Sequence, residues 1–435
     1  MFKDPGPRGR MLRGVLSNVY DKSAVTFVQF VSIPVLTAAW GAEGYGIWLM
    51  LLTVPTYIAL SDLGFGTAAG IILTQCASKG ELERANVVLQ STIAFVMGTV
   101  TIAAAGALGY AYWYAHHGAA EGPFAAGQIS LAILFITAYA LIMTQMSIVT
   151  VVYRATHKFA QAMVFAGTWI MLEGSALAVL SYFGADIVVV AAAYMLIRLC
   201  GYILFVARLK RYEPWVKIGI GLANRTMIRE LASPSAAALG LVFAIAVSLQ
   251  GMILALGASA GTAVVALFGA SRMLSRAPLQ LAGMVIRPSI PELTRAITEG
   301  NKSLERRLDG INLGISLAVT IPFGILLIVI GPWLLGQMSH GAFETDRMLF
   351  GLLSFAAAVN ATWTALATPL ISMNRQGEFA HIYLVGALLS VVVIVLISNP
   401  TAHMAALTMC LLEVAVLVRV VQRRMRTSTQ GSTAS

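Results

Sequence analysis

The chain has 435 residues, of which 58% are hydrophobic and only 11% are charged, with a formal net charge of +10. Soluble domains are closer to half apolar and a quarter charged. This composition therefore excludes an ordinary soluble protein and indicates an integral membrane protein. A large soluble core is also excluded, because it would not repeat apolar stretches of membrane-spanning length along the whole chain.

Apolar stretches recur from one end of the sequence to the other at a length that suits membrane helices, which need about 20 apolar residues. Basic side chains are concentrated in every second segment between them, beginning with the N-terminal tail and ending with the C-terminal tail. Those segments hold 24 of the 29 Lys and Arg residues, whereas the intervening segments hold only Arg347. Cytoplasmic loops collect Lys and Arg, so both termini are expected in the cytoplasm. The twelve stretches lie at 12–39, 46–77, 87–115, 128–153, 161–183, 187–207, 231–258, 262–286, 310–335, 347–372, 380–397 and 402–420.

The first stretch resembles a signal peptide, with a basic start, an apolar run and a conceivable cleavage site at Ala38 and Ala39. Asp21 and Lys22 interrupt the run, and its removal would leave eleven spans with the basic loops outside. We therefore expect an uncleaved first helix. The basic residues suit anionic lipid at the inner membrane face, so nucleic-acid binding is not expected.

The sequence is expected to fold as an all-α integral membrane protein with two six-helix bundles. The longest inner connection, 208–230, is basic and amphipathic and is expected to lie along the inner surface. It separates an N-terminal bundle at 1–207 from a C-terminal bundle at 231–421, and 422–435 is expected to be a disordered cytoplasmic tail.

A faint internal repeat supports this division. Gly41 and Gly80 are 39 residues apart, as are Gly261 and Gly300, and each pair joins an outer turn to an inner loop. Six spans per half would give both halves the same orientation. That is the parallel-repeat arrangement of some transporters.

Four cations, Lys22, Arg198, Arg272 and Arg276, lie within the apolar stretches. An ionisable group deep in a membrane helix costs about 2.5–3.5 kcal/mol, so it is usually paired or faces water. Arg272 and Arg276 are four residues apart and share one helical face. Two guanidinium groups on a buried face suit a polyanion such as a lipid diphosphate, which Arg binds bidentately. The alternative is that they pair with Glu413 or Asp62 across the bundle.

Glu173 and Arg198 are nearly equidistant from the short outer turn at 184–187, so both are expected near the midplane as an ion pair. Such a pair either fixes two helices or contributes to a cavity, and a buried pair need not add net stability. Glu413 stands alone in the last stretch. It is interpreted as a coupling residue, a partner for an Arg, or a carboxyl that stays protonated in lipid.

The first stretch carries a polar stripe, because Asn18, Lys22 and Gln29 are spaced by four and seven residues and share a helical face. Lys22 and Asp62 are each 20 residues from Ala42 and are expected at one depth, where Asp62 is a candidate coupling or ion-pair residue. The stripe predicts an aqueous cavity and substrate contact. The alternative is that Lys22 and Asp21 extend their charged groups to the inner membrane–water interface.

The opening of the chain resembles the polysaccharide-transport branch of the multidrug/oligosaccharidyl-lipid/polysaccharide (MOP) exporter superfamily, which includes the Wzx-type O-antigen flippases. The residues that carry the resemblance are Asn18, Pro34-Val35-Leu36, the "G-x-E-x-Y-G" turn at 41–46 and the "D-L-G-x-G" segment at 62–66. The resemblance implies two six-helix bundles around a central cavity and export by alternating access. It also implies that cationic cavity residues contact the pyrophosphate or acidic sugars, a role that Arg272 and Arg276 fit by position.

The leading functional hypothesis is a flippase that moves an undecaprenyl-diphosphate-linked oligosaccharide across the bacterial inner membrane for O-antigen, capsule or exopolysaccharide assembly. Its expected partners are that substrate, membrane lipids and, in such a pathway, a glycan polymerase and a chain-length regulator. The alternative is a proton- or sodium-coupled exporter of small molecules. An enzyme is not expected, because the outer loops are short and the sequence has no P-loop, Ser/His/Asp set or paired catalytic carboxylates. The three cysteines have no metal-like spacing, so neither a metal nor a cofactor is expected.

Overall fold

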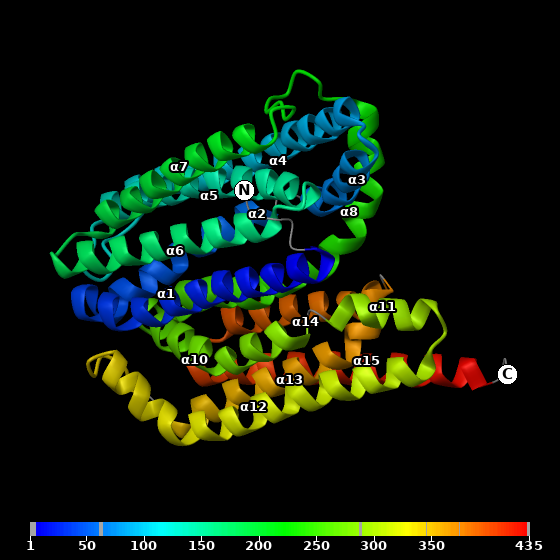
Figure 1. The fold of residues 1–435 in the computed structure, drawn as a ribbon. Coiled ribbons are helices and arrows are strands. Elements are labelled where there is room, and N and C mark those ends of the chain that lie inside the picture. Colours follow the sequence, from blue (N-terminus) through cyan, green and yellow to red (C-terminus); the bar gives the residue numbers. More distant parts are fainter. Residues whose placement is uncertain (1–5, 61–63, 287–288, 345, 374, 433–435) are drawn as a thin grey trace. The chain divides into compact units, whose positions relative to one another are not determined.

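Helices account for nearly the whole described chain (Figure 1). The structure is a computed structural model that describes residues 6–60, 64–286, 289–344, 346–373 and 375–432. Within those ranges the only bridge pairing outside the helices joins Glu121 to Phe124. The elements are α1 (Gly6–Leu51), α2 (Thr53–Leu60), α3 (Phe65–Lys79), α4 (Leu82–His117), α5 (Ala126–Ala155), α6 (Phe159–Tyr182), α7 (Ile187–Tyr212), α8 (Arg225–Ala246), the π-helix η1 (Val247–Gly251), α9 (Met252–Ala260), α10 (Thr262–Ile286), α11 (Ile290–Thr298), α12 (Lys302–Met338), α13 (Arg347–Ser372), α14 (Gly377–Leu396) and α15 (Ala402–Ser432).

Ten helices of the described chain are long and apolar enough to cross a membrane, so this is a multi-pass membrane protein. Two of the twelve predicted stretches differ from these ten. The stretch 46–77 is divided among the end of α1, α2 and α3, with a left-handed glycine, Gly64 (φ 74°), just before α3. The stretch 262–286 forms α10, which carries the two arginines and is not one of the ten.

The chain packs into two compact units. The first consists of Met1–Ala39 and Leu51–Leu239, and the second of Trp40–Met50 and Gly240–Ser435. The chain passes from the first unit to the second inside α1, near Gly41 (φ 70°, ψ −175°), which leaves the helical conformation and redirects the chain. A positive φ of this kind is readily adopted by glycine because it has no Cβ.

In the first unit, α5 packs against α4 and α7, and α6 packs against α7 (Figure 1). The first half of α1 approaches α6 closely at Gly167 and Gly174. A Cβ placed on Gly174 would lie 2.4 Å from a Val28 methyl group, so only a residue without a side chain allows this approach.

The predicted linker 208–230 lies within the first unit: its start completes α7, its end begins α8, and 213–224 lies between them. Three polar side chains of α4 hold that segment by hydrogen bonds to its backbone. Asn86 bonds Trp215 O (2.9 Å) and Lys217 N (2.8 Å), Gln90 bonds Lys217 O (2.9 Å) and Leu222 N (2.7 Å), and Ser91 accepts from Asn224 N (2.9 Å).

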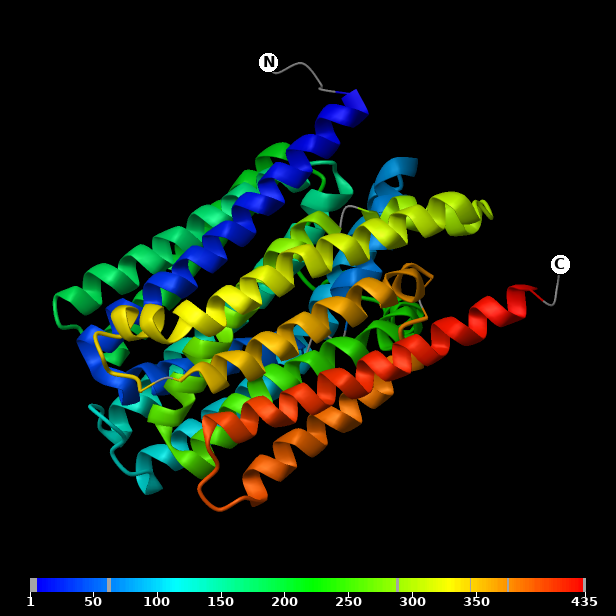
Figure 2. The ribbon, with the colours of Figure 1, turned by 90° about the horizontal axis from the view of Figure 1, so that it is seen from below.

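In the second unit, α13 packs against α12, α15 and α10, and α14 packs against α15 (Figure 2). The short end of α1 belongs here, because Gly46 lies directly against the backbone of Thr262. Helix α15 continues to Ser432, through the segment predicted as a disordered tail.

The two units repeat one helix order, since α4–α7 and α12–α15 have corresponding pairings and lengths that differ by at most five residues. The glycines that suggested the repeat also share their conformations. Gly41 and Gly261 have φ of 70° and 89°, and Gly80 and Gly300 have φ of 74° and 68°. The inner loops are closed by corresponding bonds, Glu81 N to Cys76 O and Asn301 N to Ala296 O, both 2.9 Å.

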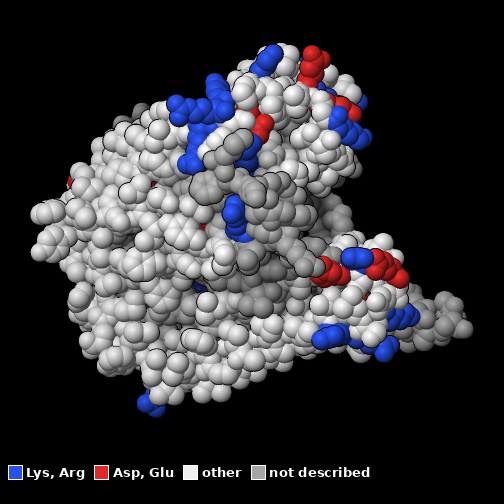
Figure 3. All heavy atoms as spheres, viewed as in Figure 1, with Lys and Arg blue, Asp and Glu red and all other residues white. Residues whose placement is uncertain are grey.

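Charged side chains gather at one end of the helices within each unit (Figure 3). In the first unit they lie over the end of α7, the segment that follows it and the start of α4. In the second they lie over α11, the start of α12 and the end of α15. These are the segments that the charge pattern places at the cytoplasmic side.

Candidate functional site

The first unit contains a buried ion pair between α6 and α7. Arg198 Nη2 lies 2.6 Å from Glu173 Oε2, and the two residues are only 5% and 3% exposed. Tyr139 on α5 completes the group, because its hydroxyl accepts from Arg198 (3.0 Å) and donates to Glu173 (3.3 Å). The Arg198 guanidinium also lies over the Tyr139 ring. Three helices are therefore joined by one charge-neutral centre, and a role for it in coupling stays a prediction.

The polar stripe of α1 is partly accessible. Asn18 and Lys22 are half-buried and Gln29 is exposed. The Lys22 ammonium lies 3.1 Å from its neighbour Asp21, whose side chain is buried, so this ion pair joins consecutive residues on one helix. Asp62, the residue expected at the same depth, lies outside the described residues.

Arg272 on α10 is tied to the π-helix of its own unit. Its Nη1 donates to Leu249 O at 2.7 Å, and its guanidinium lies over the Phe268 ring. A π-helix bonds i to i+5 rather than i to i+4, and this shift of register makes a carbonyl available to an outside donor. The sequence shows no sign of η1, so this contact could not be predicted.

Arg276 lies one turn further along the same face of α10. It forms no hydrogen bond or ion pair with any residue that the structure describes. Within the described chain neither guanidinium forms an ion pair with a carboxylate, and Asp62, one of the two carboxylates that the alternative named, lies outside the described residues, so anion binding by the two arginines stays a prediction.

Glu413 is the buried centre of the second unit, at 1% exposure. Its Oε2 accepts from Asn360 Nδ2 (2.9 Å) and Trp363 Nε1 (2.6 Å), and its Oε1 accepts from the Tyr383 hydroxyl (3.4 Å). An amide nitrogen and an indole can only donate, so both favour the ionised carboxylate as acceptor. The sequence reasoning missed these three donors. The available signal was Asn360 and Trp363, two polar groups three residues apart and hence on one face of a membrane helix.

The two buried centres occupy equivalent places in the repeat. Arg198 lies eleven residues after Ile187, the first residue of α7, and Glu413 lies eleven residues after Ala402, the first residue of α15. Their partners correspond as well: Tyr139 is thirteen residues into α5 from Ala126, and Asn360 is thirteen into α13 from Arg347. The same position thus carries a cation in one unit and an anion in the other.

Comparison with known proteins gives the fold. No protein-family model and no curated protein sequence matches the chain. Among solved structures, an inward-facing multidrug resistance MATE family transporter of the MOP superfamily aligns with a TM-score of 0.73 at 14% identity, over 97% of this chain and all of that one. An outward-facing MATE structure aligns at 0.63 and 14% identity, over 98% of this chain and 97% of that one.

A third solved structure comes from Pyrococcus furiosus and is described as a MOP superfamily transporter whose binding pocket has reversed polarity. It aligns with a TM-score of 0.66 at 13% identity, over 97% of this chain and 96% of that chain. The chain therefore has the fold of the MATE transporters of the MOP superfamily. At these identities the likeness is one of fold, and the polysaccharide-transport branch rests on the sequence motifs.

Proposed function

We propose that this protein is a flippase that moves an undecaprenyl-diphosphate-linked oligosaccharide across the bacterial inner membrane by alternating access. The observation that carries the proposal is the pair Arg272 and Arg276 on one face of α10, without a described carboxylate in direct contact. Guanidinium groups bind phosphate oxygens bidentately, and a diphosphate offers enough oxygens for two of them.

The two arginines have different parts in this proposal. Arg272 already donates to Leu249 O, so it is oriented by the protein and has its remaining nitrogens for the substrate. Arg276 has no such bond and is the more available group. Solved inward-facing and outward-facing structures of the same fold support the alternating-access mechanism. The reversed pocket polarity described for the Pyrococcus furiosus protein shows that this fold is used with more than one pocket charge.

Flux of a fluorescent lipid-linked oligosaccharide into proteoliposomes tests the proposal. Loss of one charge-assisted hydrogen-bonding partner costs about 1.5–3 kcal/mol, so Arg276→Ala should slow flux roughly 10- to 150-fold. Arg272→Ala/Arg276→Ala should slow it further. The matched control is Arg306→Ala/Arg307→Ala, two exposed arginines at the start of α12. Normal flux in the Arg272→Ala/Arg276→Ala protein, at normal protein levels, would remove both arginines from the mechanism.

A second candidate is a proton- or sodium-coupled exporter of small molecules. It is favoured by the buried, three-fold hydrogen-bonded Glu413, a group suited to exchange a proton, and by the multidrug description of the similar structures. Glu413→Gln keeps the side-chain shape and removes the titration. If this candidate is correct, the variant loses transport driven by a pH gradient and a deletion strain becomes drug-sensitive; unchanged gradient-driven transport and unchanged drug sensitivity would rule it out.

A further inference from the structure

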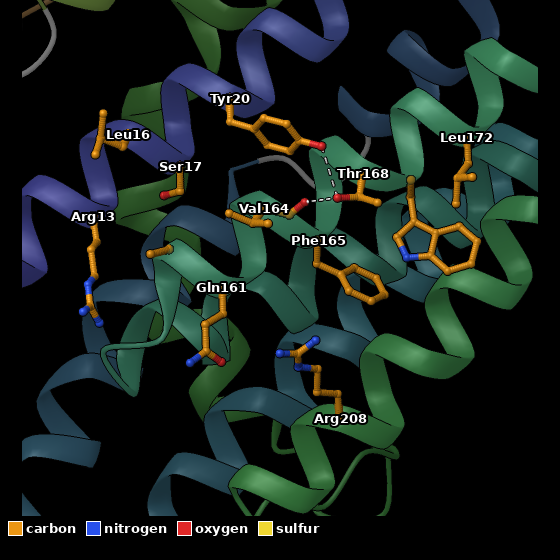
Figure 4. A pocket seen from close by; sticks show the side chains of 12 residues that line it. Arg13, Leu16, Ser17, Tyr20, Gln161, Val164, Phe165, Thr168, Leu172 and Arg208 are labelled. Carbon is orange, nitrogen blue, oxygen red and sulfur yellow. Dashed lines mark hydrogen bonds between the residues drawn. The ribbon is translucent and has the colours of Figure 1, made fainter. Parts of the chain in front are cut away.

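A groove of about 630 Å³ runs along the first unit between α1, α6 and α7 (Figure 4). We call it the α1–α6 groove. Arg13, Gln161 and Arg208 line one part of it, and Phe165, Trp169 and Leu172 line the rest. Figure 4 shows Gln161 between the two arginines and Leu172 away from them. The groove is therefore amphipathic along its length, with a basic end and an apolar end.

The basic end carries two positive charges and no acidic lining residue. Arg13 forms no hydrogen bond or ion pair with a described residue. Arg208 is oriented by Tyr212, because its Nε donates to the Tyr212 hydroxyl (3.3 Å) and its guanidinium lies over that ring. Its two terminal nitrogens are left for an outside acceptor. This end is charged and oriented for an anion.

From its basic end to its apolar end the groove has about the length of one membrane leaflet. Gln161 and Leu172 are eleven residues apart on α6, which corresponds to about 16 Å at 1.5 Å per residue. That is about half of a hydrocarbon core of roughly 30 Å. The hydrogen bond between Tyr20 Oη and Thr168 Oγ1 (3.3 Å) ties α1 to α6 along this length and fixes the width of the groove.

We propose that the α1–α6 groove binds one anionic phospholipid, with its phosphate between Arg13 and Arg208 and one acyl chain along Phe165, Trp169 and Leu172. Arg13 begins the first span and Arg208 ends the sixth, so the charge pattern places the basic end at the cytoplasmic interface. A lipid phosphate lies at that depth and its chain runs inward. A zwitterionic lipid would bring an ammonium group towards two guanidinium groups, which disfavours it. This site belongs to the first unit and is independent of the flippase proposal.

Native mass spectrometry of the full-length protein tests this assignment. The purified protein is mixed with phosphatidylglycerol or phosphatidylcholine of identical chains, and retained lipid is counted. Each basic side chain near an anionic surface strengthens binding about five-fold, so two predict a preference for phosphatidylglycerol of roughly 30-fold. Arg13→Gln/Arg208→Gln should abolish the preference. The matched control, Lys210→Gln/Arg211→Gln, removes two exposed charges from the end of α7 that do not line the groove, and should keep it.

A second variant tests the apolar end without changing charge. Val164→Trp places a large side chain at an exposed lining position and should reduce retention of both lipids. An unchanged preference in Arg13→Gln/Arg208→Gln, or an equal loss in the control, would overturn the proposal. Displacement of phosphatidylglycerol by stoichiometric undecaprenyl diphosphate would also overturn it, because the groove would then be a cargo site.

Discussion

The buried pair Glu173–Arg198 allows a sharp test of how charge is accommodated in the first unit. Glu173→Leu leaves the Arg198 guanidinium in a site where it is 5% exposed, with the Tyr139 hydroxyl and the Met146 sulfur as its remaining hydrogen-bond acceptors. Breaking a buried ion pair from one side costs about 3–5 kcal/mol, because the other charge is left uncompensated. Arg198→Met leaves the carboxylate in the same position and should cost a similar amount.

The double variant Glu173→Leu/Arg198→Met should be far less destabilised than either single variant. Replacing both charges by apolar groups of similar size is often close to neutral. The single losses would sum to about 6–10 kcal/mol if they were independent, so a near-neutral double variant implies a coupling energy of about 5 kcal/mol or more. The control is Glu299→Leu, which breaks the exposed 2.8 Å pair with Arg295 and should cost less than about 1 kcal/mol.

The assay is gel filtration of purified protein after heating in one detergent, and it gives the temperature at which half of the protein has left the monomeric peak. Membrane proteins often unfold irreversibly, so the rank order of the variants is the result to compare. We expect Glu173→Leu and Arg198→Met well below the wild type, and the double variant and Glu299→Leu close to it. The reasoning is refuted if the double variant is as unstable as the worse single variant, or if Glu173→Leu is as mild as Glu299→Leu.

Three further changes have local expected outcomes. Gly46→Ala should prevent accumulation of folded protein, because the new Cβ would lie 1.9 Å from Thr262 O, a backbone atom that cannot move away by a side-chain rotation. A normal yield on a membrane-fraction immunoblot would contradict this close approach. Asn86→Ala/Gln90→Ala should release the segment 213–224 and speed tryptic cleavage after Lys217, with Ser78→Ala, an exposed residue, as the control. Burial alone would raise the pKa of Asp346, but hydrogen bonds from Leu349 N and His403 outweigh burial and hold the pKa below its ordinary value of 3.8. The ionised carboxylate therefore stabilises the folded protein fully above pH 3.8. That stabilisation is lost as the pH falls through the lower pKa of the folded state. Asp346→Asn should flatten that acid dependence in thermal melts, and a dependence identical to wild type would exclude Asp346 as its source.

The multi-pass architecture was predictable from sequence because the bilayer dictates it. Long apolar stretches have few alternatives to membrane helices, since every backbone polar group must be bonded within the span. The repeat was visible in the sequence as four glycines. Each has a positive φ angle at a turn of the chain, and glycine is the residue that adopts such angles most readily. The ion pair of Glu173 and Arg198 followed from counting residues on both sides of a tight turn.

The division into units was less predictable for a physical reason. Trp40–Met50 joins the second unit because Gly46 packs against Thr262, a contact between residues more than 200 positions apart that no local pattern encodes. The hydrogen-bonding partners of Arg272 and Glu413 were unpredictable for a similar reason. Arg272 bonds a carbonyl of the π-helix and Glu413 accepts from an indole N–H, and both contacts depend on how each helix is rotated about its axis. A stretch that is apolar on all sides gives no sequence signal for that rotation.

The buried centres of the two units differ in net charge, so membrane voltage would act on them differently. The centre of the first unit carries no net charge, since Glu173 neutralises Arg198. Arg272, Arg276 and Glu413 of the second unit sum to +1 when the carboxyl is ionised and +2 when it is protonated. Moving one elementary charge through 100 mV is worth about 2.3 kcal/mol. A displacement of the second centre along the membrane normal therefore does electrical work that depends on one proton, whereas the same displacement of the first does none.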